Sequence, residues 1–213
     1  MTRQQQAPTV FVVDDDPSVC RALEMLVRSY GRQAETYGSA DAFLRAYRRD
    51  RPGCLVLDLR MPGMSGLELQ HEMGSRGSAL PIVFITAHGD VPAAVEALKG
   101  GATDFLQKPF RDQDLMEKIE RALELNARAR RDGAARREIT ERIRTLTSRE
   151  MEVMELVVKG VTNRRIAEGL ELSERTVEIH RARMMRKMVA RTLPDLVKMV
   201  TRGRAGPTVP PPA

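Results

Sequence analysis

The sequence predicts an α/β fold, a doubly wound parallel sheet of five strands, followed by a small all-α domain that contains a helix-turn-helix. Three observations lead to this prediction. Short apolar runs alternate with segments of helical spacing through the first 126 residues, whereas only helical spacing is found after residue 144. The charge also divides the chain, because residues 1–126 carry 15 basic and 18 acidic side chains and residues 127–213 carry 20 and 11.

Length and composition limit the possible functions. A chain of 213 residues suits one large domain or two small ones. Its net charge of +6 and pI of about 9.7 favour a polyanionic partner, and the basic excess after residue 126 predicts nucleic-acid binding there. Cys20 and Cys54 lack a C-x-x-C pattern or a nearby His, which favours buried thiols. No apolar run of about 18 residues and no signal peptide is found, so we expect a cytoplasmic protein without membrane contact.

The first half is expected to build the sheet domain over residues 8–126, after a flexible N-terminus of residues 1–7. TVFVV is a β-branched run typical of a buried strand, and apolar residues follow it at helical spacing from Val19 to Val27. The same alternation recurs along the chain. Strands are predicted at residues 8–14, 33–37, 54–57, 82–85 and 103–106, and helices at residues 17–30, 39–48, 65–73, 91–99 and 112–126.

Polar residues follow the predicted strands at their carboxyl ends, where parallel sheets bind ligands. Asp58 comes directly after a strand, and the other strands end near Asp14, Asp15, Asp16, Thr86 and Lys108. Neighbouring carboxylates repel one another, and an oxygen-only set without His or Cys favours Mg²⁺ over zinc. Taken singly, these residues also have plain interpretations: a helix N-cap for Asp16, a strand-end hydroxyl for Thr86 and a solvated charge for Lys108.

A carboxylate, a metal ion, a hydroxyl and an ammonium at one edge suit phosphoryl transfer onto a carboxylate. Asp58 is expected to attack the phosphorus atom. Lys108 and the metal ion are expected to neutralise charge on the phosphoryl oxygens, and Thr86 to donate a hydrogen bond to the transferred group. The predicted product is an aspartyl phosphate.

Four motifs, in order, resemble the receiver domain of bacterial two-component response regulators, which has the CheY-like, flavodoxin-like fold. They are VVDDDP at 12–17, LVLDLRMPGMSG at 55–66, FITAHGD at 84–90 and GATDFLQKPF at 101–110. The resemblance implies that a histidine kinase phosphorylates Asp58. It also implies that Asp15 binds Mg²⁺ with Asp14 assisting through water, and that the backbone carbonyl of Arg60 is a further ligand. A cis peptide bond before Pro109 is typical of this family.

The same resemblance implies a conformational switch. Thr86 and Lys108 read the phosphorylated state, and Phe105 is the aromatic switch residue; it lacks the hydroxyl of the Tyr found in many relatives, and a plain core Phe is the alternative. In relatives, the helix between Thr86 and Phe105 pairs two phosphorylated chains. The homodimer face here is expected to contain Val91, Val95, Glu96 and Lys99. A core position is the alternative for Val95, and His88 is interpreted as an ordinary loop residue.

Residues 127–144 read ARARRDGAARREITERIR, in which Arg dominates and few apolar positions keep helical spacing. We expect a charged helical linker that is broken or frayed near Asp132 and Gly133. The part that carries Ile139 and Ile143 is expected to form a helix that docks on the next domain. For residues 128–137, a solvated charge run is the simpler interpretation.

Residues 145–203 are predicted to form the all-α domain. Thr147 and Glu150 have the spacing of a capping box, and Thr162 and Ser173 are expected to cap the next two helices. A last helix is predicted to begin near residue 193. Two short helices joined by a tight turn predict a helix-turn-helix, whose second helix enters the major groove of DNA.

Spacing divides this second helix into two faces. The core face is expected to hold Val177, Met184 and Met188 with the stem of Arg181. The opposite face, which is expected to face DNA, holds Arg175, Glu178, Ile179, Ala182, Arg183 and Arg186. Glu178 can accept from a cytosine amino group, Ile179 can touch a thymine methyl, and Arg183 can bond guanine or phosphate. Phosphate contacts are expected from Thr162, Arg164, Arg165, Ser173, Thr176 and Lys187. For His180, partial packing and a phosphate contact remain equal alternatives.

The segment from Leu146 to Met188 is similar to the LuxR-type DNA-binding domain of the FixJ/NarL family of response regulators. The more basic members of that family carry Lys where this chain has Glu178 and Ala182, so the operator sequence is not carried over. The tail, residues 204–213, is Pro-rich and is expected to be disordered.

Together these observations favour a transcription regulator whose only chemistry is its own aspartyl phosphorylation and dephosphorylation. The expected partners are a histidine kinase, double-stranded promoter DNA and RNA polymerase, and analogy with the FixJ subgroup favours activation over repression. One alternative is a phosphorylation-independent regulator with a vestigial receiver, against which the intact pocket argues. A hydrolytic enzyme would need a substrate pocket and a second acid near Asp58, such as the one in a D-x-D motif, which DLRMP lacks. An RNA-binding protein would need more aromatic residues than the 4% found here.

Overall fold

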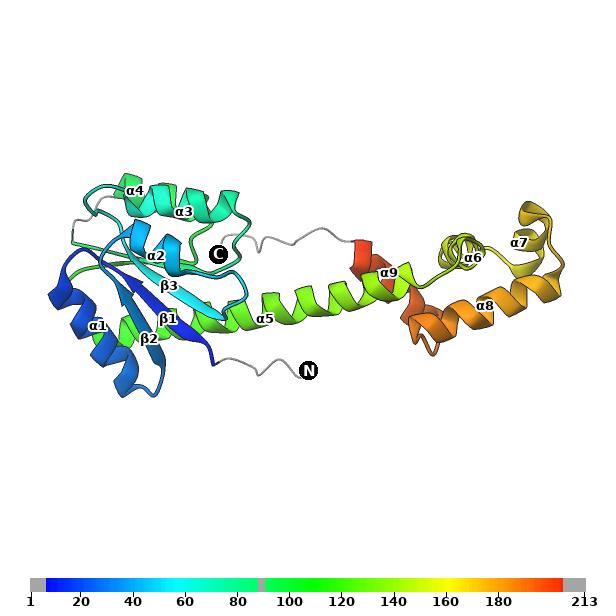
Figure 1. Cartoon of the computed structure of the whole chain (residues 1–213), viewed down its shortest axis with the longest axis horizontal. Helices are drawn as coiled ribbons and strands as arrows, with labels where there is room; N and C mark the ends of the chain where they lie inside the picture. The colour runs from blue at the N-terminus through cyan, green and yellow to red at the C-terminus, as the bar shows by residue number, and fades with distance from the viewer. Residues whose placement is uncertain (1–6, 88–90, 205–213) are drawn as a thin grey trace. The chain divides into compact units, whose positions relative to one another are not determined.

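The computed structural model in Figure 1 describes residues 7–87 and 91–204. The chain divides into two compact units, and the division falls after Arg130, inside one long helix. His88 and most of the two predicted terminal segments lie outside the described residues. No described helix is long and apolar enough to cross a membrane.

The first unit contains a five-stranded sheet in which every pair of neighbouring strands is parallel. The spatial order of the strands is β2-β1-β3-β4-β5, as expected for a doubly wound fold. This confirms the predicted fold class, and the predicted strand bounds agree to within one or two residues. The strands are β1 (Thr9–Val13), β2 (Gln33–Tyr37), β3 (Gly53–Asp58), β4 (Ile82–Thr86) and β5 (Asp104–Gln107).

Helices cover both faces of this sheet (Figure 1). They are α1 (Pro17–Ser29), α2 (Ala40–Ala46), α3 (Gly66–Ser75), α4 (Val91–Lys99) and the first part of α5 (Asp112–Arg144). Successive side chains of a strand point to opposite faces, so Val10 and Val12 pack with α1 and α5, whereas Phe11 and Val13 pack with α2, α3 and α4. Both faces of the central strands are therefore buried, which explains their continuous apolar runs.

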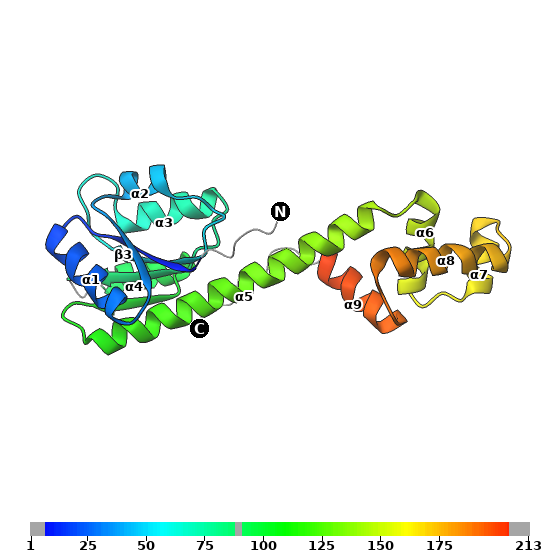
Figure 2. The same ribbon diagram turned by 60° about the horizontal axis from the view of Figure 1, so that its bottom comes forward.

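The linker is continuous helix, and the predicted break near Asp132 and Gly133 is wrong. Figure 2 shows α5 as one unbroken helix, which runs through Gly133 to Arg144. A glycine inside a helix costs only about 1 kcal/mol relative to Ala, and the Ala, Arg and Glu residues around it are good helix formers. The predicted docking is confirmed, because Ile139 is buried in the core of the second unit.

The second unit consists of the end of α5 and four further helices around one apolar core. They are α6 (Ser148–Val158), α7 (Asn163–Leu170), α8 (Glu174–Met188) and α9 (Leu193–Arg204). The Thr147–Glu150 capping box and the Ser173 cap are confirmed. Thr162 occupies the N-cap position of α7, as predicted, but its side chain makes no capping hydrogen bond. Because this helix end is exposed, water can satisfy its first N–H groups.

Candidate functional site

The ends of four neighbouring strands bring the predicted polar side chains together. Asp14 follows β1, Asp58 ends β3, Thr86 ends β4 and Lys108 follows β5. These strands are adjacent and parallel, so their carboxyl ends meet at one edge of the sheet. Asp14 is 2% exposed, Asp58 is 7% exposed and Thr86 is 2% exposed. The site therefore places two carboxylates in a largely dry environment, where charge interactions are strong.

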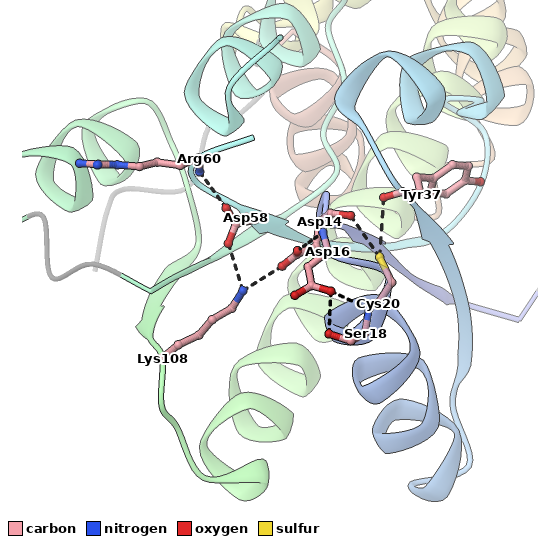
Figure 3. Close-up of polar contacts among 8 residues, drawn as sticks. All are labelled: Asp14, Asp16, Ser18, Cys20, Tyr37, Asp58, Arg60 and Lys108. Atoms are coloured by element: carbon pink, nitrogen blue, oxygen red, sulfur yellow. Dashed lines mark hydrogen bonds and ion pairs between the residues drawn. The ribbon is translucent and has the colours of Figure 1, made fainter. Parts of the chain in front are cut away.

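One ammonium bridges the two carboxylates. Figure 3 shows Lys108 extending between Asp14 and Asp58, with Nζ 2.8 Å from Asp14 Oδ2 and 3.1 Å from Asp58 Oδ1. The backbone N–H of Arg60 donates to the other oxygen of Asp58 at 2.8 Å, and the N–H of Asp16 donates to Asp14 Oδ1 at 2.9 Å. With both carboxylates ionised, the cluster holds one more negative than positive charge.

Burial raises the pKa of Asp58 above its usual range, although the hydrogen bonds from Arg60 and Lys108 act in the opposite direction. For Lys108, burial by itself would lower the pKa. Its hydrogen bonds to Asp14 and Asp58 outweigh this effect, and the pKa of Lys108 lies above the usual range. Lys108 is therefore a permanent cation beside a carboxylate that is destabilised by burial.

The residues around this cluster have the donor chemistry that suits Mg²⁺. Asp14, Asp58 and the exposed Asp15 carry carboxylates, and the Arg60 carbonyl is a further oxygen donor. Within residues 7–87 and 91–204, no group of three His, Cys, Asp or Glu side chains is arranged to hold a metal ion. Mg²⁺ commonly uses one or two carboxylates and takes its other oxygens from water and phosphate, so this open donor set fits that ion.

Residues next to the pocket confirm three simpler predictions. Asp16 caps α1, because its carboxylate accepts the Ser18 N–H at 2.7 Å, and Pro17 is the first helical residue. The peptide bond between Lys108 and Pro109 is cis. Both cysteines are free and buried, and burial raises the pKa of each thiol. The contact of Cys20 Sγ with the Asp14 carbonyl, at 3.3 Å, was not predicted, because it depends on packing.

The outer face of α4 is exposed and partly apolar. Val95 is 43% exposed, so the alternative that it belongs to the core is wrong, and Glu96 and Lys99 are exposed beside it. The side chain of Val91 lies outside the described part of the structure. Leu98, which is 40% exposed, was missed by the sequence analysis, although its spacing of three residues from Val95 could have identified it. Phe105 is half-buried and packs against the core beneath α4.

The second unit presents to solvent the side chains that were predicted to face DNA. The predicted core residues Val177, Met184 and Met188 of α8 are fully buried, while Arg181 donates to Asn163 Oδ1 at 2.9 Å. Arg175, Glu178, Ile179, Ala182, Arg183 and Arg186 of α8 are all exposed, as is Glu174 in its first turn, and Thr162, Arg164, Arg165 and Ser173 are exposed nearby in the sequence. Thr176 is partly buried beside the Ser173 cap, with the two hydroxyl oxygens 2.7 Å apart.

Two residues predicted to contact DNA, Lys187 and His180, interact with or pack against other residues of the second unit. The Lys187 ammonium donates to Glu150 Oε2 at 2.6 Å and to the Thr145 carbonyl at 3.0 Å, so it is held by the protein and not directed freely to a phosphate. His180 Nδ1 is buried and has no hydrogen-bond partner within the described residues. This favours the packing interpretation for that ring nitrogen.

An acidic pocket on a doubly wound sheet, together with a helix-turn-helix unit, defines a two-domain protein that joins a receiver to a DNA-binding module. The sequence model of the response regulator receiver domain family matches residues 10–120. That of the bacterial regulatory proteins of the luxR family matches residues 144–200. The chain therefore belongs to the response regulators that combine a receiver domain with a LuxR-type DNA-binding domain. This is a family of transcription regulators, not a class of enzymes.

Individual relatives support this assignment over nearly the whole chain. The transcriptional regulatory protein FixJ of Rhizobium meliloti (strain 1021) is 46% identical over 200 residues, which cover 94% of this chain and 98% of that protein. The response regulator protein TodT of Pseudomonas putida is 42% identical over 197 residues, which cover 92% of this chain and 87% of that protein. The solved structure of the response regulator StyR has a TM-score of 0.84 and 46% identity, covering 92% of this chain and 99% of that one.

Proposed function

We propose that Asp58 accepts a phosphoryl group from a histidine kinase, and that the phosphorylated chain dimerises, binds double-stranded promoter DNA and activates transcription. The observation that carries the proposal is the buried cluster in which Lys108 bridges Asp14 and Asp58. A buried carboxylate that shares its counter-ion is a poor structural element but a suitable phosphoryl acceptor. The proposal places the chain in the cytoplasm, with RNA polymerase as a further partner.

In the chemical step, an oxygen of Asp58 forms a bond to phosphorus while the bond between phosphorus and the kinase imidazole nitrogen breaks. The electron pair of the broken bond stays on that nitrogen, which is then neutral or takes up a proton. Lys108 and the Thr86 hydroxyl donate hydrogen bonds to oxygens of the transferred group, where negative charge develops. Asp14, Asp15, Asp58 and the Arg60 carbonyl would hold Mg²⁺, which would supply positive charge to offset the negative charge of the phosphoryl group.

Phosphorylation adds about 1.5 to 2 negative charges and strong hydrogen-bond acceptors at Asp58. The Thr86 hydroxyl moves toward them, and Phe105 and α4 shift with it, which favours the arrangement in which two chains pair. The exposed apolar side chains Val95 and Leu98 make α4 the best candidate for this pairing. We assign Val91, Glu96 and Lys99 to the same dimer face.

A dimer presents two copies of α8 to two half-sites of duplex DNA. Arg175, Arg183 and Arg186 are exposed on α8 and can bind guanine edges or phosphates. Glu178 can accept a hydrogen bond from a cytosine amino group, and Ile179, which is 44% exposed, can contact a thymine methyl.

The test is phosphorylation of the purified full-length chain with acetyl phosphate and Mg²⁺, followed by intact-mass measurement. The wild type should gain one phosphoryl group, whereas Asp58→Asn should gain none, and excess EDTA should reduce incorporation into the wild type. Equal incorporation into both proteins would place the acceptor elsewhere. No incorporation into the wild type, from acetyl phosphate or from a phosphorylated kinase, would favour the vestigial receiver.

A further inference from the structure

A buried amide joins α3 to the last turn of α4. Gln70 of α3 is 7% exposed and shares its helix face with the apolar residues Leu69 and Met73. Its Nε2 donates a hydrogen bond of 2.8 Å to the carbonyl oxygen of Ala97 in α4. A buried polar side chain on an apolar helix face is costly unless it is hydrogen-bonded, so this contact satisfies the amide and also connects the two helices.

The Ala97 carbonyl lies at the end of α4, where carbonyls lose their usual helical donors. The N–H of Gly101, four residues on, donates to Leu98 instead, and the Ala97 oxygen accepts the Ala102 N–H at 3.0 Å. The Gln70 amide supplies a second donor to this oxygen. The C-terminal end of α4 is therefore tied both to the segment that leads into β5 and to α3.

Gly100 shows that the two helices fit closely at this point. A Cβ atom on Gly100 would lie 2.9 Å from Gln70 Oε1 and 3.0 Å from both Cδ and Nε2. The backbone of Gly100 is not in the left-handed region, unlike that of Gly101 with φ 91°. The absence of a side chain at Gly100 thus serves to make room for the Gln70 amide and not to permit a special backbone conformation.

We infer that Gln70 is a positioning residue that holds the C-terminal end of α4 and opposes its displacement before phosphorylation. This inference rests on the proposed function, in which phosphorylation of Asp58 shifts α4. A displacement of α4 relative to α3 lengthens the bond between Gln70 and Ala97, whereas the arrangement described here keeps it at 2.8 Å. The bond therefore favours this arrangement over the shifted one. It adds to the free energy that phosphorylation must supply to shift α4.

The test compares Gln70→Leu, which removes the donor and keeps a buried side chain of similar size, with a matched control. Asn126 is a second buried amide, 5% exposed, that accepts the Gly53 N–H at 3.2 Å and donates to the Ala79 carbonyl at 3.4 Å. Asn126→Leu therefore removes comparable hydrogen bonds from the same unit without touching α4. Both variants of the full chain are measured by sedimentation equilibrium, with and without acetyl phosphate and Mg²⁺.

Gln70→Leu should raise the association constant for dimerisation, measured without acetyl phosphate, by about 2- to 10-fold. The reason is that a hydrogen bond of ordinary net strength is lost from the unshifted arrangement of α4 only. Gly100→Ala should act in the same direction, because its Cβ displaces the amide. Asn126→Leu should leave the dimerisation constant unchanged, even though it also lowers the thermal midpoint. The increase in Gln70→Leu should persist when Asp58→Asn is added, because it does not depend on phosphorylation.

Equal dimerisation constants for the wild type, Gln70→Leu and Gly100→Ala, in a wild type that dimerises with acetyl phosphate, would overturn this inference alone. An equal increase in Asn126→Leu would also overturn it, because general loosening of the unit would then explain the effect. A wild type that does not respond to acetyl phosphate would overturn both the proposed function and the inference.

Discussion

The two units each contain a buried carboxylate beside a lysine, and the two environments act on the carboxylate in opposite directions. In the first unit, Lys108 is shared between Asp14 and Asp58, and burial keeps the pKa of Asp58 above its usual range. In the second unit, the Lys187 ammonium donates a hydrogen bond to Glu150, and this bond holds the pKa of Glu150 below the usual range.

The difference lies in which effect on the pKa is larger: burial for Asp58, and the hydrogen bond from Lys187 for Glu150. Glu150 Oε2 accepts both the Lys187 ammonium at 2.6 Å and the Thr147 N–H at 2.8 Å, so its charge is paired and also completes a helix cap. Asp58 lies beside a second carboxylate and shares its ammonium with it. A carboxylate and a lysine therefore complete a helix cap in the second unit, whereas in the first unit they lie in the pocket that we propose accepts the phosphoryl group.

The largest stability effect is expected when the satisfied pair is broken. Lys187→Met leaves the Glu150 carboxylate buried without its cation. Because about one third of the Lys187 side chain is exposed, the free energy of unfolding of the second unit should fall by about 2 kcal/mol, less than for a fully buried pair. Thermal unfolding monitored in this unit measures the change.

Arg164→Met is the matched control for Lys187→Met, because its partner Glu168 is largely exposed. It should cost about 0.5 kcal/mol or less. The two variants should differ in DNA binding as well. Loss of a phosphate contact at Arg164 should reduce the slope of log affinity against log salt by about 0.9. Lys187→Met should leave that slope unchanged, and a reduced slope would show that Lys187 does contact DNA.

Removing the charge of each carboxylate should change stability in opposite directions. The folded state disfavours ionised Asp58, so Asp58→Asn should raise the free energy of unfolding of the first unit, by about 1 kcal/mol at neutral pH. Glu150→Gln should lower that of the second unit, because the folded state favours ionised Glu150. Denaturant unfolding of the two variants measures both signs, and a shared sign would contradict the comparison.

The pH dependence separates the two carboxylates further. The advantage of Asp58→Asn over wild type should shrink as pH falls through the raised pKa of Asp58, and it should be gone below the ordinary value of 3.8. The deficit of Glu150→Gln should be fully present above the ordinary value of 4.5 and should shrink only as pH falls below it toward the lowered pKa of Glu150. Unfolding measured between about pH 3 and 7 should show the Asp58→Asn difference shrinking at higher pH than the Glu150→Gln difference. The reverse order would contradict the pKa directions given for the two carboxylates.

The smaller of the two stabilising effects is expected at the C-terminal end of α8. Val189 is 59% exposed and has a left-handed backbone with φ 57°, which is strained for a β-branched residue. Val189→Asn should raise the free energy of unfolding of the second unit by about 1 kcal/mol or less, because Asn tolerates this conformation. An unchanged or lower thermal midpoint would show that the Val189 side chain contributes contacts that outweigh the strain.

The pocket can be located from the sequence because each of its residues lies at or just after the end of a strand, and a parallel sheet brings strand ends together. Asp14, Asp58, Thr86 and Lys108 could therefore be grouped from strand positions alone. The contacts from Gln70 to Ala97 and from Lys187 to Glu150 could not, because they join residues 27 and 37 positions apart without a spacing pattern. The helix break predicted at Gly133 fails because the low helix propensity of one glycine is outweighed by the helix-forming residues around it.

The central claim is that phosphorylation of Asp58 controls dimerisation and DNA binding. The most direct test is sedimentation equilibrium of the wild type and Asp58→Asn, with Mg²⁺ and acetyl phosphate, in the absence and presence of duplex DNA selected from a random pool by the phosphorylated wild type. Only the wild type should shift from monomer to dimer and gain affinity for the duplex. If the wild type and Asp58→Asn show the same dimerisation and the same affinity, the receiver does not control the DNA-binding unit and the account is wrong.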